Sequence, residues 1–293
     1  MKILHVAVFT PTSTNVSQAD GFETLGHEVI RYDYRARLQA LGSMHHRDQE
    51  LIDLCFRISP DIMLFSKCNG MDFRVLEECR NVTTTVMWYM DGLKGFNSEV
   101  RQKFVYSDFI FCSVRVCFQE AKKYSSNSYW HPCEGGYDSR IHYPMDIPKI
   151  FDVVFIGCID GYILPYRRQL KNQVEFTAFD NIHNEQHAKT VSETKINLSL
   201  TDGVGISNRL YKLLGAGGFV LTMPFDTMDE NFTSGKDFVV FNDPTDLKQK
   251  IKYYLEHEKE REVIALHGHN TVKKYDHIAY GKFILEKIND RQT

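Results

Sequence analysis

Residues 195–221 read KINLSLTDGVGISNRLYKLLGAGGFVL, and this stretch decides the fold class. Its apolar start, residues 196–200, predicts a buried strand, and the loop after that strand carries Gly203 and Gly205. A helix should follow, because apolar residues then recur at helical spacing and a pair of glycines ends the run before a second strand. Strand, glycine-bearing loop, helix and strand in this order are typical of a parallel α/β sheet.

The start of this predicted helix carries residues suited to an anion. Ser207 or Asn208 can cap the helix, and Arg209 lies in its first turn. A helix N-terminus at the carboxyl edge of a parallel sheet binds anions, because free N–H groups and the positive end of the helix dipole point outward there. An arginine adds a planar fork that fits phosphate. We therefore predict a nucleotide diphosphate as the ligand; the alternative is an ordinary crossover helix with an arginine on its surface.

The second half of the chain also follows the order of a known family. The matching positions are Asn197-Leu198, Arg209, Gly217-Gly218, Gly235-Lys236-Asp237, Tyr253-Tyr254-Leu255, His257, Glu260-Arg261, Ile264-Ala265 and Gly268. In this order they resemble the carboxyl-terminal half of the CgeB-like branch of the group-1 glycosyltransferase superfamily, which has the GT-B fold. The resemblance implies a hexosyl- or pentosyltransferase that moves a sugar from a nucleoside diphosphate sugar to an acceptor hydroxyl.

Length and element order predict two domains. A chain of 293 residues, 43% of them apolar, can bury two cores. Strands and helices alternate in both halves, so we expect an α/β fold with two Rossmann-like domains, the GT-B architecture, whose parallel sheets are flanked by helices. Residues 1–140 would form the acceptor-side domain and residues 150–280 the donor-binding domain, with a Gly- and Pro-containing linker in 135–149. The C-terminal helix, 277–290, could pack back on the first domain.

Composition argues against several classes of protein. The formal net charge is −3, no apolar run reaches the ~18 residues of a membrane span, and the chain begins with a predicted strand rather than a signal peptide. Seven cysteines, an odd number without a CxxC pair, are typical of reduced thiols. We therefore expect a cytoplasmic protein without a membrane partner, and its oligomeric state stays open.

The start of the second half carries further donor-site candidates. A predicted strand runs into Gly157, and Arg167 and Arg168 follow, which resembles the start of the family's donor domain. A glycine at the carboxyl end of a strand lets the backbone approach a ligand, and an arginine on the next helix can reach a diphosphate. We expect Arg168 to do so rather than Arg167; the alternative for both is a solvated helix face.

One position departs from the family. Three residues after Arg209 the family usually has a glutamate that hydrogen-bonds the ribose, whereas this chain has Lys212. Lysine is a donor only, so it cannot replace a carboxylate that accepts from ribose hydroxyls. Either Lys212 supplements Arg209 on the phosphates, or it extends to solvent. The donor is expected to be a UDP-sugar, but the departure leaves its identity open.

The predicted catalytic residue is Asp91, which follows a strand at 83–89. A carboxylate at the carboxyl end of a strand projects into the crevice of an open sheet. The family has an Asp-Asp loop here, of which this chain keeps one acid. Asp91 could take the proton of the acceptor hydroxyl if the transfer inverts configuration, or orient the acceptor if it retains it. The alternative is an Asx turn that closes the strand.

Three more residues are candidates for the acceptor side. Thr12 and Ser13 lie in a hydroxyl-rich loop after the first strand and could hydrogen-bond a polar acceptor, although an N-cap explains Ser13 equally well. His131 could line the cleft, and a structural role is the alternative. Twelve histidines are mostly scattered, and His45-His46 has no acidic or Cys partner at ligand spacing. Transferases of the fold that the chain resembles usually stabilise the leaving diphosphate with arginine, lysine and helix dipoles, and no Asp-x-Asp pattern is present. The resemblance therefore implies that neither a metal nor a cofactor is needed.

The acceptor itself is left as a polysaccharide, a protein or a small molecule. A phage-type DNA glycosyltransferase, acting on hydroxymethylated or already modified pyrimidine bases, is an alternative because Arg31, Arg35, Arg37 and Arg47 cluster with His45-His46. Such a cluster is more often a solvated surface. A further alternative is a non-catalytic module that binds sugar nucleotides.

Overall fold

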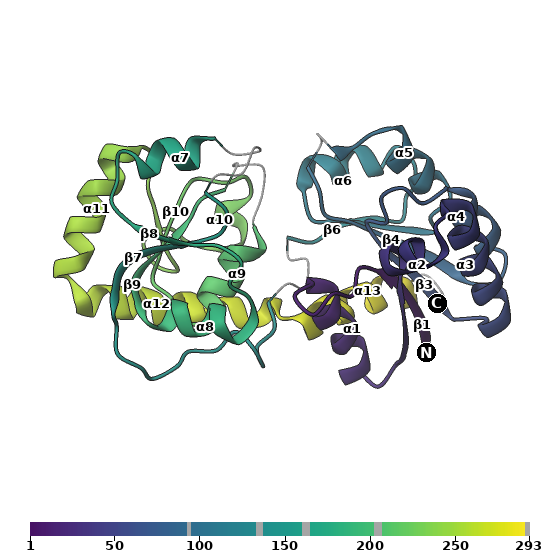
Figure 1. Ribbon diagram of the computed structural model, residues 1–293, viewed down its shortest axis with the longest axis horizontal. Coiled ribbons are helices and arrows are strands. Elements are labelled where there is room, and N and C mark those ends of the chain that lie inside the picture. Colours follow the sequence, from purple (N-terminus) through teal and green to yellow (C-terminus); the bar gives the residue numbers. More distant parts are fainter. Residues whose placement is uncertain (93–94, 133–136, 160–164, 202–206, 291–293) are drawn as a thin grey trace. The chain divides into compact units, whose positions relative to one another are not determined.

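The computed structural model describes residues 1–92, 95–132, 137–159, 165–201 and 207–290 (Figure 1). The chain divides into two compact units, which we call unit 1 (Met1–Gly135 with His277–Thr293) and unit 2 (Gly136–Asp276). Each unit contains a parallel β-sheet with helices packed against it. The predicted α/β fold with two Rossmann-like domains is therefore confirmed.

The described strands of unit 1 form one parallel sheet in the order β2-β1-β3-β4-β5-β6. These strands are β1 Lys2–Ala7, β2 Glu28–Asp33, β3 Ile62–Ser66, β4 Thr84–Tyr89, β5 Phe109–Cys112 and β6 Ser128–Trp130. The helices of the unit are α1 Thr14–Thr24, α2 Tyr34–Leu41, α3 Met44–Ile58, α4 Arg74–Cys79, α5 Ser98–Val105, α6 Arg115–Ala121 and α13 His277–Asn289.

Each face of this sheet has its own helices, because successive side chains of a strand point to opposite faces. Leu4 and Val6 of β1 belong to the core that α3, α4, α5 and α6 cover. Ile3 belongs to the core on the other face, which α1 and α13 cover. Helix α13 contributes Tyr280 and Ile284, both at most 1% exposed, although it lies far along the sequence from the strands it covers (Figure 1).

The described strands of unit 2 are parallel too, in the order β11-β10-β9-β7-β8. These strands are β7 Phe151–Ile156, β8 Thr177–Phe179, β9 Thr194–Ser199, β10 Val220–Thr222 and β11 Val239–Val240. The helices are α7 Tyr166–Lys171, α8 Asn184–Ser192, α9 Asn208–Gly215, α10 Met228–Asn231, α11 Pro244–Glu256 and α12 Glu258–Val272, followed by a short 3₁₀ helix, Lys273–Tyr275.

Residues 137–149, predicted as linker, belong to unit 2. Tyr137 is 1% exposed, and a Cβ on Gly215 of α9 would lie 2.1 Å from its ring. Asp138 and His142 are buried as well. The predicted domain limits at 140, 150 and 280 therefore differ from the observed division after residues 135 and 276. Glycine and proline content does not reveal that an aromatic ring in the same segment packs against a helix.

The strand order reverses once in each sheet. In unit 1 the reversal lies between β1 and β3, and in unit 2 it lies between β7 and β9. In open α/β sheets ligands bind outside the carboxyl ends of the strands at such a reversal, because neighbouring connections leave in opposite directions there and open a crevice. The two reversals therefore locate the regions in which site residues should be sought.

Helix α9 begins and ends as the sequence predicts. The Ser207 side chain caps it and accepts a hydrogen bond from the Arg209 backbone N–H at 3.1 Å. At the other end Gly217 adopts φ +73°, and the N–H of Gly218 donates to the carbonyl of Leu213 at 2.9 Å. This is the Schellman arrangement, which needs a left-handed residue just past the helix and so favours glycine.

Candidate functional site

The guanidinium of Arg209 lies at the strand reversal of unit 2. Its Nε donates to the carbonyl of Ile156 at 2.9 Å and its Nη1 to the carbonyl of Leu200 at 3.4 Å, so it bridges the carboxyl ends of β7 and β9. The guanidinium carbon also lies 4.9 Å from the centre of the Phe155 ring. The side chain therefore turns inward from α9 and remains partly exposed at the sheet edge.

A second guanidinium, that of Arg167 on α7, lies in the same place. It donates to the carbonyl of Cys158 at 3.1 Å and to that of Leu200 at 2.8 Å. Its carbon lies 5.1 Å from the centre of the Phe155 ring, so both arginines share this ring and the Leu200 carbonyl. The sequence prediction favoured Arg168 over Arg167, but Arg167 is the arginine that accompanies Arg209.

The electrostatics of this pair favour an anion. Among the described residues, no carboxylate forms an ion pair with Arg167 or Arg209; both side chains donate to backbone carbonyls. Burial, and then the charge of Arg167, lower the pKa of Arg209 to about 10. Two neighbouring cations without an acid are costly in a partly dry environment, so an anionic ligand would stabilise them.

Gly157 makes room for this arrangement. Its φ is +148°, and a Cβ at this position would lie 2.6 Å from Nη2 of Arg209. The prediction expected the missing side chain to let the backbone approach a ligand, whereas its observed effect is to admit the guanidinium. The strand–glycine pattern alone could not reveal this, because the guanidinium comes from a residue about fifty positions further along the chain.

Arg168 lies beside the same glycine, in a hollow of about 440 Å³ outside the carboxyl ends of β7 and β8. Lys171 and Asp180 also line the hollow. Its volume lies within the range of small-molecule sites. Arg168 is exposed there, so it is placed to reach a ligand that extends from the arginine pair.

Lys212 lies one turn after Arg209 on α9 and is partly exposed. Burial, and then its positive charge, lower the pKa of His142 to about 4. The pKa of His187 lies well below its ordinary value, because of burial and of the charges of His142, Lys212 and Arg209. The rings of these histidines lie 5.7 Å apart. Because both pKa values are lowered, both rings are neutral near pH 7. This pair was not predicted from the sequence, because the two histidines meet only after folding.

Asp91, the predicted catalytic residue, follows β4 and forms an ion pair with Lys67, with Oδ2 2.7 Å from Nζ. Lys67 directly follows β3, the neighbouring strand, and both side chains are about one-third exposed. Lys67 was not among the predicted site residues. An Asx turn at Asp91 would involve residue 93, which lies outside the described residues, as do Gly203 and Gly205.

The other predicted acceptor-side residues, Thr12, Ser13 and His131, differ in their surroundings. Ser13 caps α1 and accepts from the Asn15 backbone N–H at 3.3 Å, so its hydroxyl already has the structural role given as the alternative. Thr12 is exposed beside it. The His131 ring lies 4.5 Å from the Phe283 ring, in contact with α13. His131 thus packs among aromatic side chains of unit 1.

The arginine cluster that suggested DNA is largely neutralised. Arg31 pairs with Asp20 and Glu23, and Arg37 pairs with Glu50. Arg47 is fully buried and pairs with Asp48. These acids lie far enough away in the sequence that charge counting over a short window missed most of them. Arg35 is exposed and donates to the Tyr34 hydroxyl at 3.3 Å, so most but not all of the cluster's positive charge is paired with acids.

Comparisons with known proteins agree with the geometry. Residues 153–280 match a family described as Glycosyl transferase-like. Anabaena Alr3699/HepE in complex with UDP-glucose has a TM-score of 0.72 at 9% identity, with 99% of this chain and 100% of that chain covered. The sucrose-phosphate synthase of Thermosynechococcus elongatus has a TM-score of 0.69 at 10% identity, with both chains covered in full. The fold is the GT-B fold.

The same fold also occurs in other sugar-nucleotide enzymes. The UDP-GlcNAc 2-epimerase of Neisseria meningitidis, bound to UDP-GlcNAc, has a TM-score of 0.62 at 14% identity, with 99% of this chain and 100% of that chain covered. None of the curated protein sequences matches this chain. Along the described residues, no helix combines the length and apolar character that a membrane crossing requires.

Proposed function

We propose that this protein is a glycosyltransferase that uses a UDP-sugar and needs no metal ion. The observation that carries the proposal is the pair of guanidiniums, Arg167 and Arg209, at the strand reversal of unit 2 without an acidic partner among the described residues. The match of residues 153–280 to a glycosyl transferase-like family supports it. So do the UDP-glucose and UDP-GlcNAc complexes of proteins with this fold.

The proposed chemistry needs a stabilised leaving group. The bond between the anomeric carbon and the β-phosphate oxygen breaks, and its electron pair leaves with the diphosphate. A new bond forms between that carbon and the acceptor oxygen. Arg167 and Arg209, with Arg168 and Lys212 nearby, would neutralise the charge that develops on the diphosphate, which is the task a metal ion performs in other enzymes. Ser207 and Asn208 would place the N-terminus of α9 toward the phosphates.

Asp91 is the proposed group on the acceptor side. In an inverting reaction its carboxylate would take the proton of the acceptor hydroxyl, and in a retaining reaction it would orient that hydroxyl. The proposed acceptor is a hydroxyl group of a polysaccharide, a protein or a small molecule. DNA is the less favoured acceptor, since three of the four arginines that suggested it, Arg31, Arg37 and Arg47, are paired with acids.

Nucleotide binding tests the donor half of the proposal. We expect UDP and UDP-glucose to raise the melting temperature in the presence of EDTA, because a ligand that binds the folded state stabilises it by mass action. NAD and ATP serve as comparison ligands. Stabilisation by NAD or ATP alone would overturn the proposal, and a requirement for a divalent cation would overturn its metal-independent part.

Product analysis separates the proposed transferase from an epimerase and from a binding module. Release of UDP together with a glycosylated acceptor, or with free glucose when water is the acceptor, is expected of a transferase. An epimerised sugar product would overturn the proposal and indicate an epimerase, like the UDP-GlcNAc 2-epimerase of Neisseria meningitidis. Binding without any product would leave a sugar-nucleotide-binding module.

A further inference from the structure

Lys67 occupies a strained turn at the strand reversal of unit 1. Its φ is +66°, and the N–H of Cys68 donates to the carbonyl of Ser66 at 2.8 Å. A hydrogen bond across one residue of positive φ defines a γ-turn of the rare, strained kind. Cys68 has φ +51°, so two consecutive residues that are not glycine lie in the left-handed region. Each such residue is unfavourable for an L-amino acid, and such strain persists only where the surroundings impose it.

Buried charged side chains hold this turn in place. Lys103, which is fully buried, donates from Nζ to the carbonyl of Cys68 and pairs with Glu99 Oε1 at 2.5 Å. The same oxygen of Glu99 accepts from the N–H of Gly70 at 2.8 Å. Arg47, also fully buried, donates from Nη2 to the carbonyl of Gly70 at 2.7 Å. Two buried cations thus bind backbone carbonyls of one loop.

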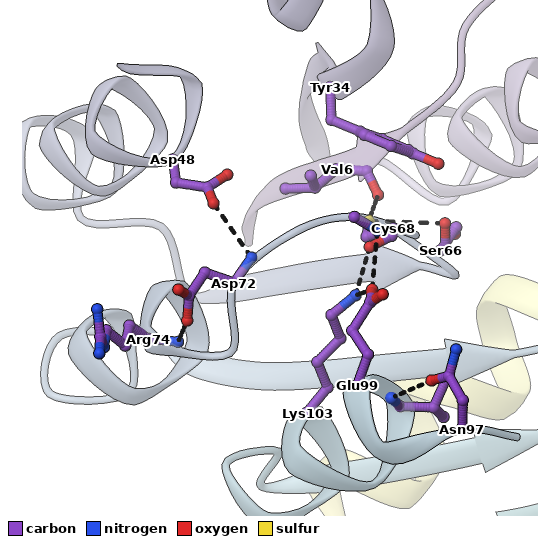
Figure 2. Close-up of polar contacts among 12 residues, drawn as sticks. Val6, Tyr34, Asp48, Ser66, Cys68, Asp72, Arg74, Asn97, Glu99 and Lys103 are labelled. Atoms are coloured by element: carbon purple, nitrogen blue, oxygen red, sulfur yellow. Dashed lines mark hydrogen bonds and ion pairs between the residues drawn. The ribbon is translucent and has the colours of Figure 1, made fainter. Parts of the chain in front are cut away.

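The Cys68 side chain adds a third attachment. Its thiol donates to the carbonyl of Val6 on β1 at 3.1 Å, which ties the turn to the other strand of the reversal. Figure 2 shows Lys103 and Glu99 converging on Cys68 from one side, with Val6 on the other. A loop that only connected β3 to α4 would not need buried charges, because these are costly to desolvate. The network therefore maintains one specific backbone conformation.

This conformation places the Lys67 ammonium 2.7 Å from Oδ2 of Asp91. We propose that Lys67 is a positioning residue that holds the Asp91 carboxylate by Oδ2, so that Oδ1 receives the acceptor hydroxyl. This inference rests on the proposed function. Lys67 only holds the carboxylate. In an inverting transfer the hydroxyl proton moves to Asp91 as the acceptor oxygen bonds to the anomeric carbon; in a retaining transfer Asp91 orients the hydroxyl, and the proton passes to the oxygen of the departing diphosphate.

Kinetics of UDP release from UDP-glucose, with water as acceptor, test the role. Asp91→Asn should lower kcat by ~10²-fold with unchanged UDP affinity and melting temperature, because the carboxylate is lost but the side-chain size is kept. Lys67→Met should lower kcat by roughly 10-fold with unchanged KM, and Lys67→Arg should restore most of it. In the Asp91→Asn background, Lys67→Met should have no further effect. Independent, additive losses would show that Lys67 does not act through Asp91.

A measurement without turnover separates this inference from the proposed function. The carboxyl ¹³C resonance of Asp91, identified by its absence in Asp91→Asn, should shift in Lys67→Met and return in Lys67→Arg. An unchanged resonance in Lys67→Met overturns the positioning role whether or not the protein releases UDP. A shifted resonance in a protein that binds no UDP would instead overturn the proposed function.

Glycine substitution tests the strain. Lys67→Gly should raise the melting temperature by about 2 °C, because glycine adopts φ +66° without steric cost, and should lower UDP release as Lys67→Met does. Ser59→Gly is the matched control. Ser59 has φ +43° after α3, so its replacement should raise the melting temperature without affecting UDP release. A lower melting temperature for Lys67→Gly would contradict the strained turn.

Discussion

At the scale of single residues, the candidate donor site depends on side chains that meet from three segments. Arg209 comes from α9, Arg167 from α7, and the space for them from Gly157 after β7. The sequence identified Arg209 and Gly157, because a capped helix and a glycine at a strand end have local signatures. It favoured Arg168, whereas Arg167 is the arginine that lies beside Arg209. Neighbouring residues of a helix point in different directions, and their assignment requires the rotation of α7 about its axis.

Loss of one guanidinium should weaken nucleotide binding. Arg209→Ala would remove the proposed charge-assisted contact with the diphosphate, worth ~1.5–3 kcal/mol, so the Kd for UDP should rise about 10- to 100-fold. Arg167→Ala should have a similar effect. Calorimetric titration measures both, and Arg80→Ala, which removes an exposed arginine of unit 1, is the control. Unchanged UDP affinity in a folded Arg209→Ala protein would contradict the placement.

At the scale of elements, α9 was predictable and the γ-turn after β3 was not. The cap at Ser207 and the Gly217-Gly218 end of α9 follow from local preferences that act within a few residues. The turn at Lys67 opposes such preferences, since lysine rarely adopts a positive φ. Its conformation is imposed by Lys103 and Arg47, which come from other helices. Local strain of this kind appears only once tertiary contacts are known.

The end of α9 gives a stability prediction. Gly217→Ala should lower the free energy of unfolding by about 1–2 kcal/mol for the left-handed backbone alone. The alanine should lower the free energy of unfolding further, because its Cβ would lie 2.9 Å from Cγ of Pro144. Gly42→Ala is the control, since Gly42 has φ +65° but no atom within 4 Å of a Cβ. Urea unfolding should show the larger loss for Gly217→Ala; equal losses would mean that Pro144 moves aside.

At the scale of the whole molecule, both units contain histidines that burial keeps neutral. Burial, and then the charge of Arg31, lower the pKa of His5 in unit 1 to about 3. Burial lowers the pKa of His142 in unit 2 to about 4 and that of His187 further below its ordinary value. In the unfolded chain these rings titrate near 6.5. The unfolded state therefore takes up protons first as the pH falls.

The free energy of unfolding should consequently be highest above about pH 6.5 and should decrease as the pH falls toward 4. The loss should approach ~1.4 kcal/mol per pH unit for each buried histidine. Urea unfolding at pH 7.5 and at pH 5.5 measures this loss of unfolding free energy. His142→Gln should reduce the pH dependence, whereas His45→Gln, which replaces an exposed ring, should not. Equal unfolding free energies at the two pH values would contradict the neutral, buried state of these rings.

Helix α13 has a consequence for the order of folding during synthesis. Unit 2 is continuous from Gly136 to Asp276, so all of its residues leave the ribosome before α13 does. Unit 1 cannot cover Phe22 and Trp88 until α13 has been made, because α13 supplies Tyr280 and Ile284 to that core. The first half of the nascent chain therefore keeps one apolar face of its sheet exposed while unit 2 folds. Chaperones that bind exposed apolar surface would be expected to engage the first half rather than the second.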